Sequence, residues 1–378
     1  MKNRQNWVII GVMLALTVIL WGGFGWGQPD VRVIHPEPET SRTTTSTGSV
    51  YSLATVSRAV DSSPDLKGAV LAGSSPMDGG AVDMAKMPIV PGLRATRTRN
   101  AQGTLGMSTM MTPQGVDVAG HYLISSAYDH GEQYNSTLYI QDIRTNKLVK
   151  TVVLQGRPHV GGITYDADHQ QLFVCGEYQG TAEIIGIKLK RLLAYDDKSA
   201  RPIKYDSRTS LGTQSRASFI TYHSGILFVG FFNPKSSGYM QHYDVNKKGQ
   251  IVGAGPLQQL QNQVSVVSTA LFKQHTLSKV QGAVFYGGYA FLSQSFGPGP
   301  SKLYVFKENL LKESFSERDA VLVLKMPSHL EQISTYQGRM YLIFESSAAA
   351  YRKTSQDHVD RILSLDLATL VKEVRHAK

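Results

Sequence analysis

The chain has 378 residues, of which 42% are hydrophobic, and a formal net charge of +10 at pH 7. This composition excludes an intrinsically disordered chain and allows one large or two ordinary domains with a sizeable core. The lysines and arginines are scattered, without the dense basic run of a nucleic-acid-binding arm, so nucleic acid is not an expected partner. The positive charge instead favours anionic surfaces such as phospholipid headgroups or cell-wall polyanions.

The N-terminal residues contain a candidate membrane segment. Lys2 and Arg4 precede an uncharged run from Trp7 to Trp26, which matches the ~20 residues that a helix needs to cross the hydrocarbon core. Tryptophans at both ends fit the interfacial aromatic belt, and the basic residues predict an N-terminus inside the cell. A cleaved signal peptide usually has a shorter apolar region and a small-x-small cleavage site, which GFGWGQPD does not offer. We expect a single-pass signal anchor over 7–26, with 1–6 cytoplasmic and the body outside; cleavage would make the protein secreted.

The next two segments differ from the rest of the chain in composition. Residues 27–49 are rich in proline, serine and threonine, which predicts a flexible linker because such a segment cannot bury enough apolar surface to fold alone. Residues 50–112 form a poorly defined tether, in which the run VYSLATV is typical of a strand that docks on the main domain. The single cysteine, Cys175, excludes an intrachain disulfide and lies in the apolar run LFVC, where a small buried hydrophobe is expected.

A repeated pattern runs from residue 113 to the C-terminus at 378. Each unit has a small or polar lead-in, a short alternating strand, a tight turn and a second strand of large apolar residues, which is typical of a β-hairpin. The hairpins are QGVDVAGHYLISSA, GGITYDADHQQLFVCG, ASFITYHSGILFVG, QGAVFYGGYAFLSQS and EQISTYQGRMYLIFES. The predicted third strands are STLYIQDI, TAEIIGI, GYMQHYDV, KLYVFKE and RILSLDL, and the predicted fourth strands are KLVKTVVL and AVLVLKM.

Five such units recur at a spacing of roughly 45–65 residues, the range of four-stranded propeller blades. The lack of a helical period between them argues against a doubly wound α/β sheet, and five related units argue against a simple sandwich. We therefore predict an all-β fold over 113–378, a β-propeller of about five four-stranded blades, or six if 50–112 supplies more than one strand. Either VYSLATV or the C-terminal LVKEV is expected to complete a blade and so protect its edge.

These segments resemble a group of uncharacterised bacterial extracytoplasmic β-propeller proteins, membrane-anchored or secreted and broadly similar to YVTN- and NHL-type propellers. The residues that carry the resemblance are PQGVDVAGHYLISSAYD, NSTLYIQDIRTNKLVKTVVLQGRPHVGGITYD, SKVQGAVFYGGYAFLSQSFG and EQISTYQGRMYLIFESSAAAYR with DHVDRILSLDL. They cover most of 113–367, and the membrane segment and the linker lie outside them. The resemblance implies the fold and an extracytoplasmic location, and it supplies no catalytic residues.

Polar residues from different repeats are expected to meet at one face of the propeller. The loops that lead into the first strand of each blade, and those that join its second and third strands, lie on the face where ligands usually bind. The residues predicted to bind a ligand there are Gln114, Asp129, His130, His159, Glu177, Tyr178, Arg216, Gln281, Gln294, Glu331 and Gln332. The aromatic residues Tyr128, Phe231, Phe232 and Phe296 fall in or beside the same loops, where flat rings can stack on sugars.

Catalysis or metal binding at this mouth is a second hypothesis. Glu331 and Glu345 come from the lead-in and the second strand of one blade and, with His159, are the candidate acid and base. No G-x-S-x-G elbow accompanies the serines, so a serine nucleophile is not expected. Candidate ligands for Ca2+ or a transition ion are Asp129, His130, His159, Glu177 and Glu345. No short spacing such as HxxxH supports such a site, so no metal or cofactor is expected, with Ca2+ as the alternative.

The loop RPHVGGITYD around His159 has a structural and a functional interpretation. Its glycines match the small lead-in residues of the other units, whereas no other unit has a histidine at the position of His159. We expect a membrane-anchored, outward-facing binding module that holds a cell-envelope glycan, peptide or protein at its channel mouth. The alternatives are an extracytoplasmic lyase or hydrolase that uses the same mouth, and a scaffold whose faces bind proteins without a small ligand.

Overall fold

The computed structural model describes residues 44–68, 84–212, 214, 216–252, 257–260, 263–267, 270 and 272–376. All described residues belong to one compact unit within 33–378. The predicted signal anchor over 7–26 therefore lies outside the described residues, as does most of the predicted linker over 27–49. Within the described ranges, no helix is both long enough and apolar enough to span a membrane.

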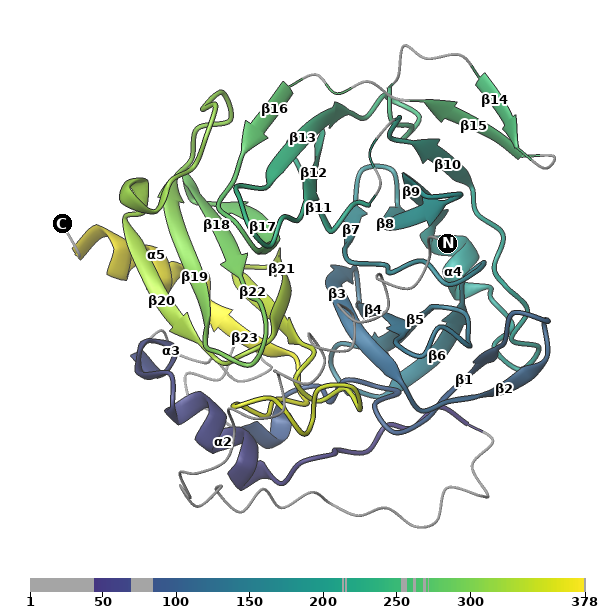
Figure 1. Cartoon of the computed structure of the whole chain (residues 1–378), viewed down its shortest axis with the longest axis horizontal. Coiled ribbons are helices and arrows are strands. Elements are labelled where there is room, and N and C mark those ends of the chain that lie inside the picture. The colour runs from purple at the N-terminus through teal and green to yellow at the C-terminus, as the bar shows by residue number, and fades with distance from the viewer. Residues whose placement is uncertain are drawn as a thin grey trace, which may run out of the picture. The chain divides into compact units, whose positions relative to one another are not determined.

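Five sheets in the described part of the chain surround a central axis as the blades of a propeller (Figure 1). Blade one contains β3 (Met111–Ala119), β4 (Tyr122–Asp129), β5 (Thr137–Asp142) and β6 (Leu148–Val153). Blade two contains β7 (Ile163–Asp166), β8 (Gln171–Tyr178), β9 (Thr181–Lys188) and β10 (Ser207–Ser210). Blade three contains β11 (Phe219–His223), β12 (Ile226–Phe231), β13 (Tyr239–Asp244) and β16 (Phe272–His275).

The last two blades complete the ring. Blade four contains β17 (Val280–Tyr286), β18 (Tyr289–Gln294), β19 (Ser301–Lys307) and β20 (Leu322–Met326). Blade five contains only β21 (Leu330–Tyr336), β22 (Arg339–Phe344) and β23 (Leu363–Asp366) among the described residues. The innermost strands touch their neighbours in the order β3, β7, β11, β17 and β21, and β21 returns to β3. The predicted propeller of five blades is thus confirmed, and the region 50–112 adds no sixth blade within its described residues.

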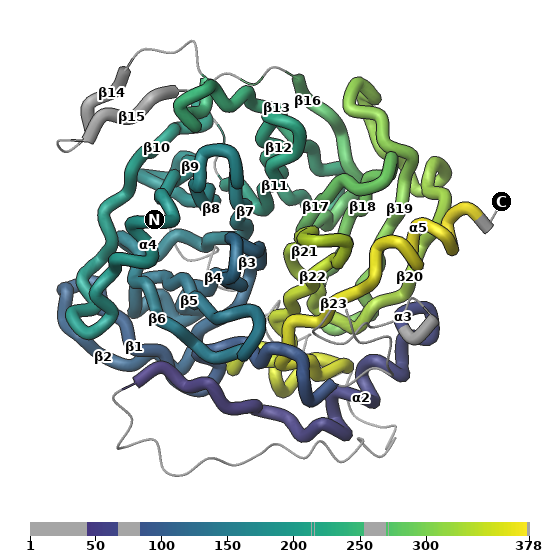
Figure 2. The backbone as a smooth tube through the Cα atoms, turned by 180° about the vertical axis from the view of Figure 1, so that it is seen from behind, coloured from purple at the N-terminus to yellow at the C-terminus, as the bar shows by residue number. Residues whose placement is uncertain are grey.

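Two additional hairpins and several short helices of the described chain lie outside the five blades. A hairpin of β14 (Leu257–Leu260) and β15 (Gln263–Val267) is inserted between β13 and β16, and β15 pairs in parallel with β10. A second hairpin, β1 (Thr96–Arg99) and β2 (Leu105–Ser108), lies beside β6 at the outer edge of blade one (Figures 1 and 2). The short helices are α3 (Pro64–Gly68), η2 (Met84–Lys86), α4 (Leu189–Leu193) and η3 (Glu317–Asp319).

The blades pack face to face through apolar side chains, because strands of a propeller are covered on both sides. All nine positions of β3 are buried. Between blades one and two, Ile140 and Val152 join Ile185 and Ile187 in one apolar cluster, and similar clusters fill the spaces between the following blades. The inner strands also approach closely, since a Cβ atom on Gly162 would lie 2.7 Å from the main-chain nitrogen of Ile220. The predicted structural role of this glycine is confirmed.

The two segments predicted to be closing strands are helices instead. The run VYSLATV leads into α2 (Leu53–Asp61), where the Ser52 side chain caps the first turn and the buried Val56, Ala59 and Val60 lie on one face. The run LVKEV lies within α5 (Leu367–His376). In both segments the buried apolar residues recur every three to four positions along one helix face, and this pattern favours a helix over a strand.

The edge of blade five is covered by the segment that precedes the propeller. Ile89 forms a single antiparallel bridge with Arg361, and the main-chain N–H of Val90 donates to the carbonyl of Asp360 at 3.0 Å. The Asp360 carboxylate accepts hydrogen bonds from the main-chain N–H groups of Val50 at 2.8 Å and Tyr51 at 3.0 Å. The described part of the predicted tether is therefore integral to the folded body, which it joins to its last blade (Figure 2).

Candidate functional site

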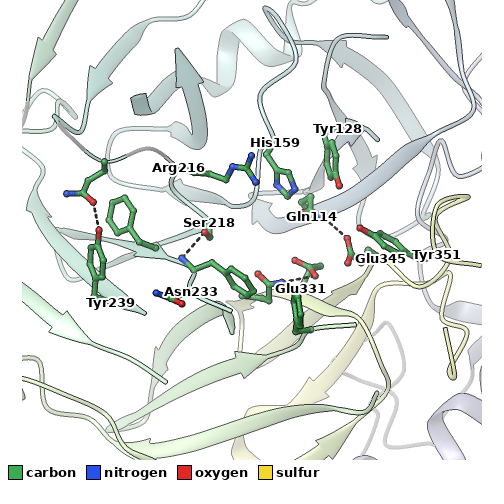
Figure 3. Close-up of a pocket in the computed structure, with 15 residues that line it drawn as sticks. Gln114, Tyr128, His159, Arg216, Ser218, Asn233, Tyr239, Glu331, Glu345 and Tyr351 are labelled. Atoms are coloured by element: carbon green, nitrogen blue, oxygen red, sulfur yellow. Dashed lines mark hydrogen bonds between the residues drawn. The ribbon is translucent and has the colours of Figure 1, made fainter. Parts of the chain in front are cut away.

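A cavity of about 580 Å³ lies where the inner strands begin, and residues from all five blades line it (Figure 3). One side carries polar groups of blades one, two and five, and the other carries aromatic groups of blades three and four. Its lining is Gln114, Tyr128, His159, Gln214, Arg216, Ser218, Phe231, Phe232, Asn233, Tyr239, Gln281, Phe296, Glu331, Glu345 and Tyr351. We call it the mouth cavity.

Three β-bulges deliver polar side chains to this cavity. The register of the inner strand shifts between Pro113 and Val116 in blade one, between Val280 and Gly282 in blade four, and between Leu330 and Ile333 in blade five. The residues at these irregularities include three cavity residues, Gln114, Gln281 and Glu331. A bulge bends its strand and redirects a side chain, which is why such irregularities occur beside functional sites.

The centre of the polar side is a pair of carboxyl groups, those of Glu331 and Glu345. Gln281 Nε2 donates to Glu331 Oε1 at 3.2 Å, and Gln114 Nε2 donates to Glu345 Oε2 at 2.9 Å. Burial raises the pKa of both carboxyls, and the neighbouring Glu345 raises the pKa of Glu331 further. Two adjacent buried carboxyls resist losing both protons. The pair therefore holds a proton at neutral pH.

His159 and two tyrosines extend the polar side. The imidazole of His159 stacks on the ring of Tyr128, with centroids 4.1 Å apart. Burial, followed by the charges of Arg216 and His130, lowers the pKa of His159 to about 4. Burial also raises the pKa of Tyr128 above its ordinary value and that of Tyr351 to about 12. At neutral pH these side chains are uncharged hydrogen-bonding groups.

The His159 loop has an unusual backbone. Val160 has a φ of 48°, a left-handed conformation that is rare for a β-branched residue. Lys279 and His329, which lead into the inner strands of blades four and five, have φ values of 61° and 62°. The same sharp bend thus precedes three inner strands, and it costs on the order of 1 kcal/mol or more at each non-glycine residue.

The opposite side of the mouth cavity is aromatic. The rings of Phe232 and Phe296 lie 5.9 Å apart, and Phe231 stacks on Tyr239 at 4.8 Å. Phe296 is 61% exposed, which is high for a phenylalanine, so its ring is available to a ligand. Arg216 lies between the two sides (Figure 3).

The structure brings six of the predicted site residues together in the cavity lining. They are Gln114, His159, Arg216, Gln281, Glu331 and Glu345. Their convergence from separate repeats follows the predicted propeller geometry, and their contact with a ligand stays a prediction. Two predicted residues lie just behind the lining. Glu177 Oε2 is 3.9 Å from Arg216 Nε, and His130 Nδ1 is 3.1 Å from the hydroxyl of Tyr128.

Gln332 is buried in the structure rather than facing the cavity. Its side chain accepts hydrogen bonds from the main-chain N–H groups of Val116 at 3.1 Å and Ile163 at 2.9 Å. It donates to the carbonyls of Ile163 at 2.6 Å and Ile220 at 2.9 Å. This one side chain connects blade five to the inner strands of blades one, two and three. Both of its polar atoms are therefore used in hydrogen bonds between blades.

The side chains of three further predicted residues contact other groups of the protein instead of facing the cavity. Asp129 accepts hydrogen bonds from the Ser108 hydroxyl at 2.6 Å and from the N–H of Gln133 at 2.7 Å, which shapes the loop after β4. Gln294 Nε2 donates to a main-chain carbonyl in the lead-in of its own blade at 3.0 Å. The Tyr178 ring lies 4.5 Å from the guanidinium of Arg208. None of the three lines the mouth cavity.

Four cavity residues were missed by the sequence interpretation. Tyr351 follows Glu345 in the connection between β22 and β23, whose length was a usable signal because long propeller loops often reach the mouth. Gln214, Ser218 and Tyr239 carry no such signal. Among the described residues, no three His, Cys, Asp or Glu side chains come close enough to hold a metal ion, and the five candidate ligands form no such group.

Comparison with known proteins gives no activity. No curated protein matches the chain. A hydrazine synthase chain of Kuenenia stuttgartiensis is 11% identical, with 64% of this chain and 58% of that chain covered and a TM-score of 0.34. This chain thus spans less than two thirds of that protein.

Two other similar structures come from bacteria. A putative oxidoreductase (glucose dehydrogenase) of Thermus thermophilus is 14% identical, with 72% of this chain and 91% of that chain covered and a TM-score of 0.38. A protein of unknown function from Bacteroides thetaiotaomicron is 13% identical, with coverages of 71% and 73% and a TM-score of 0.35. Similarities of this size do not bear on activity. At the level of families, residues 68–253 match the model of DUF6454, a family of unknown function.

Proposed function

We propose that this protein is a membrane-anchored, outward-facing binding module that recognises a cell-envelope glycan in its mouth cavity. The observation that carries the proposal is the composition of that cavity, in which hydrogen-bonding groups face aromatic rings, of which that of Phe296 is exposed. Ligand sites of this kind are concave, and a few converging polar groups in them orient the ligand. The membrane anchor and the outward orientation rest on the pattern of residues 1–26.

The protonation of the polar side favours hydroxyl groups as ligands. A carboxyl pair that shares a proton, a neutral imidazole and two neutral phenols offer donors and acceptors side by side. Sugar hydroxyls both donate and accept, so they match such a surface, whereas a strongly anionic ligand would be repelled by the charge left on Glu331 and Glu345. Arg216 supplies one cation at the edge, which suits a sugar that carries a single acidic group.

The aromatic side favours a ring-shaped ligand. Phe296 is exposed and lies near Phe232, so the apolar face of a sugar ring can pack on these rings while its hydroxyls reach Glu331 and Glu345. A peptide can use the same rings, but its main chain presents fewer hydroxyl-like groups to the carboxyl pair.

The test is binding of purified full-length protein to fragments of isolated envelope glycan. Phe296→Ala should weaken the affinity about fivefold or more, since stacking contacts of this kind contribute about 1 kcal/mol or more. Leu311→Ala is the matched control, because Leu311 is 81% exposed and lies outside the mouth cavity. Equal affinity of the Phe296 variant and the control would refute the proposal. Binding that protease treatment of the envelope removes and glycosidase treatment leaves intact would make the ligand a peptide or protein.

Acid–base catalysis at the same mouth is a second candidate, favoured by the raised pKa of the carboxyl pair. A carboxyl that keeps its proton near neutral pH can act as a general acid, and its ionised partner can act as a base. The test is a turnover screen on the glycan fragments with Glu331→Gln and Glu345→Gln. Turnover that both variants abolish, with binding retained, would establish an enzyme. Turnover that survives both would exclude these residues.

A further inference from the structure

A second candidate site lies on the outer side of blades one and two, where the β1–β2 hairpin meets the segment that connects β9 to β10. Two surface cavities of about 580 and 390 Å³ flank the segment that connects β9 to β10. Arg99 lines the first and Arg97 lines the second. These arginines are two residues apart on β1, so their side chains lie on the same face. We call the two cavities together the basic groove.

The cations on this face are bound by neutral carbonyl groups. Arg97, Arg99 and Lys150 all donate to main-chain oxygens of residues 193–200 and so fasten this connection to blade one. The contacts are Arg97 to Asp197 and Lys198, each at 2.7 Å, Arg99 to Ser199 at 2.7 Å and Ala200 at 2.8 Å, and Lys150 to Leu193 at 2.5 Å and Tyr195 at 3.1 Å. A carbonyl satisfies a donor without cancelling its charge.

Elsewhere in the described ring, arginines pair with carboxylates. Arg208 binds Glu183 at 2.7 Å, and Arg191 binds Asp206 at 2.8 Å. In the basic groove, by contrast, the ion pairs seen between described residues involve none of its cations. Those cations are Arg97, Arg99, Lys150, Arg157, Lys198 and Arg201. They outnumber the acidic neighbours Glu132, Asp196 and Asp197, so the groove is positive overall.

Apolar side chains project beside these charges. Leu105 pairs directly with Arg99 across the β1–β2 hairpin, so both side chains lie on one face. Leu105 is 40% exposed, and Val149, which lines the second cavity, is 44% exposed. A cationic surface with protruding aliphatic side chains is the combination that binds the interface of an anionic membrane.

We propose that the basic groove binds the phosphate groups of anionic phospholipids and holds the propeller side-on against the membrane. The first described residues of the chain support a lipid over a soluble polyanion. Thr44 and Thr45 line the second cavity, and they directly follow residues 1–43, which contain the predicted anchor. Arg157 and Arg201, the exposed arginines of the groove, suit the ligand because a planar guanidinium can bind two phosphate oxygens at once. This inference rests on the outward, membrane-near location in the proposed function and not on the glycan.

The experiment uses a fluorescent probe at the groove of the full-length protein. The native Cys175 is buried, so a Val149→Cys variant can be labelled selectively with an environment-sensitive dye. Mixed with, or incorporated into, vesicles of phosphatidylcholine with about a third phosphatidylglycerol, the dye should shift to the blue. It should not shift with phosphatidylcholine alone. A dye at Leu311→Cys, on an exposed loop of blade four, is the control and should respond to neither.

Charge variants decide between the explanations. Arg157→Gln with Arg201→Gln should abolish most of the shift, whereas Lys307→Gln with Lys325→Gln, two exposed lysines of blade four, should leave it unchanged. An equal shift with neutral vesicles would mean apolar insertion only and would overturn the proposal. No shift with anionic vesicles, combined with groove-dependent binding of long-chain polyphosphate, would make the ligand a soluble polyanion. Glycan binding at the mouth is measured separately, so either proposal can fail alone.

Discussion

Ionisable side chains such as that of Glu331 are buried in the mouth cavity, whereas those of the basic groove lie at the surface. At the mouth, burial raises the pKa of Glu331 and Glu345, so the pair keeps a proton that exposed carboxyls would lose. Burial also lowers the pKa of His159, so the imidazole stays neutral. In the groove, Arg97 and Arg99 stay at the surface and are held by carbonyls. In the two proposals, desolvation favours hydroxyl-rich ligands at the mouth, and uncompensated charge favours anions at the groove. The comparison teaches that depth of burial, as well as residue type, sets the charge that a site offers to a ligand.

The largest expected change in the free energy of unfolding is at Gln332, which joins the inner strands of the blades. Gln332→Leu leaves buried N–H and carbonyl groups of three blades without partners, and each such group costs about 1–3 kcal/mol. We expect a loss of about 3 kcal/mol or more in the free energy of unfolding, measured by urea denaturation. Gln294→Leu, which removes a single side-chain hydrogen bond, should cost about 1 kcal/mol. Equal losses would show that Gln332 does not hold the blades together.

A smaller change in the free energy of unfolding, which depends on pH, is expected when one carboxyl of the Glu331–Glu345 pair is removed. A carboxyl whose folded pKa is raised keeps a proton that the unfolded chain has lost, so stability falls as pH rises through the folded pKa. Glu345→Gln should therefore remove part of this fall and make the protein about 1–2 kcal/mol more stable than the wild type at pH 9. At pH 5 the two proteins should differ less. Denaturation at both pH values measures the difference.

Other titrating groups also contribute to the pH dependence of stability, among them Asp117 and His159. Burial raises the pKa of Asp117 to about 7. Asp117 therefore also lowers the stability as the pH rises, and it does so equally in the wild type and in the Glu345→Gln variant. The lowered pKa of His159 acts only as the pH falls below about 6.5 toward 4, so it leaves the alkaline slope unchanged. Glu313→Gln, at an exposed position, is the control. An unchanged slope in Glu345→Gln would mean that the pair holds no shared proton.

The smallest effect on stability is expected in the basic groove. Arg157 and Arg201 are exposed, and surface charges usually change the free energy of unfolding by less than about 0.5 kcal/mol. Arg157→Gln with Arg201→Gln should therefore leave the urea midpoint nearly unchanged, while the response to anionic vesicles becomes weaker and less sensitive to salt. A large loss of stability would contradict the contrast between the two sites, because it would mean that the groove arginines stabilise the fold rather than form a binding surface.

The sequence alone determined the repeating hairpins, because alternation of apolar residues and turn chemistry are local properties. All five predicted hairpins and third strands are present in the ring, together with the two predicted fourth strands. The same repeat placed Gln114, Gln281 and Glu331 at one mouth, since equivalent positions of successive blades meet at the axis. These inferences needed only the order of strands and not their packing.

Tertiary structure decided the rest. The second half of VYSLATV lies in helix α2 rather than in a strand, and Val56, Ala59 and Val60 are buried on one face of that helix. Glu331 and Gln332 are neighbours in sequence, yet a bulge places one at the cavity and the other in the axis. The shared proton of Glu331 and Glu345 and the carbonyl-bound arginines of the groove depend on residues far apart in the chain. Burial and long-range contacts set pKa and net charge at a site, and neither is encoded in local spacing.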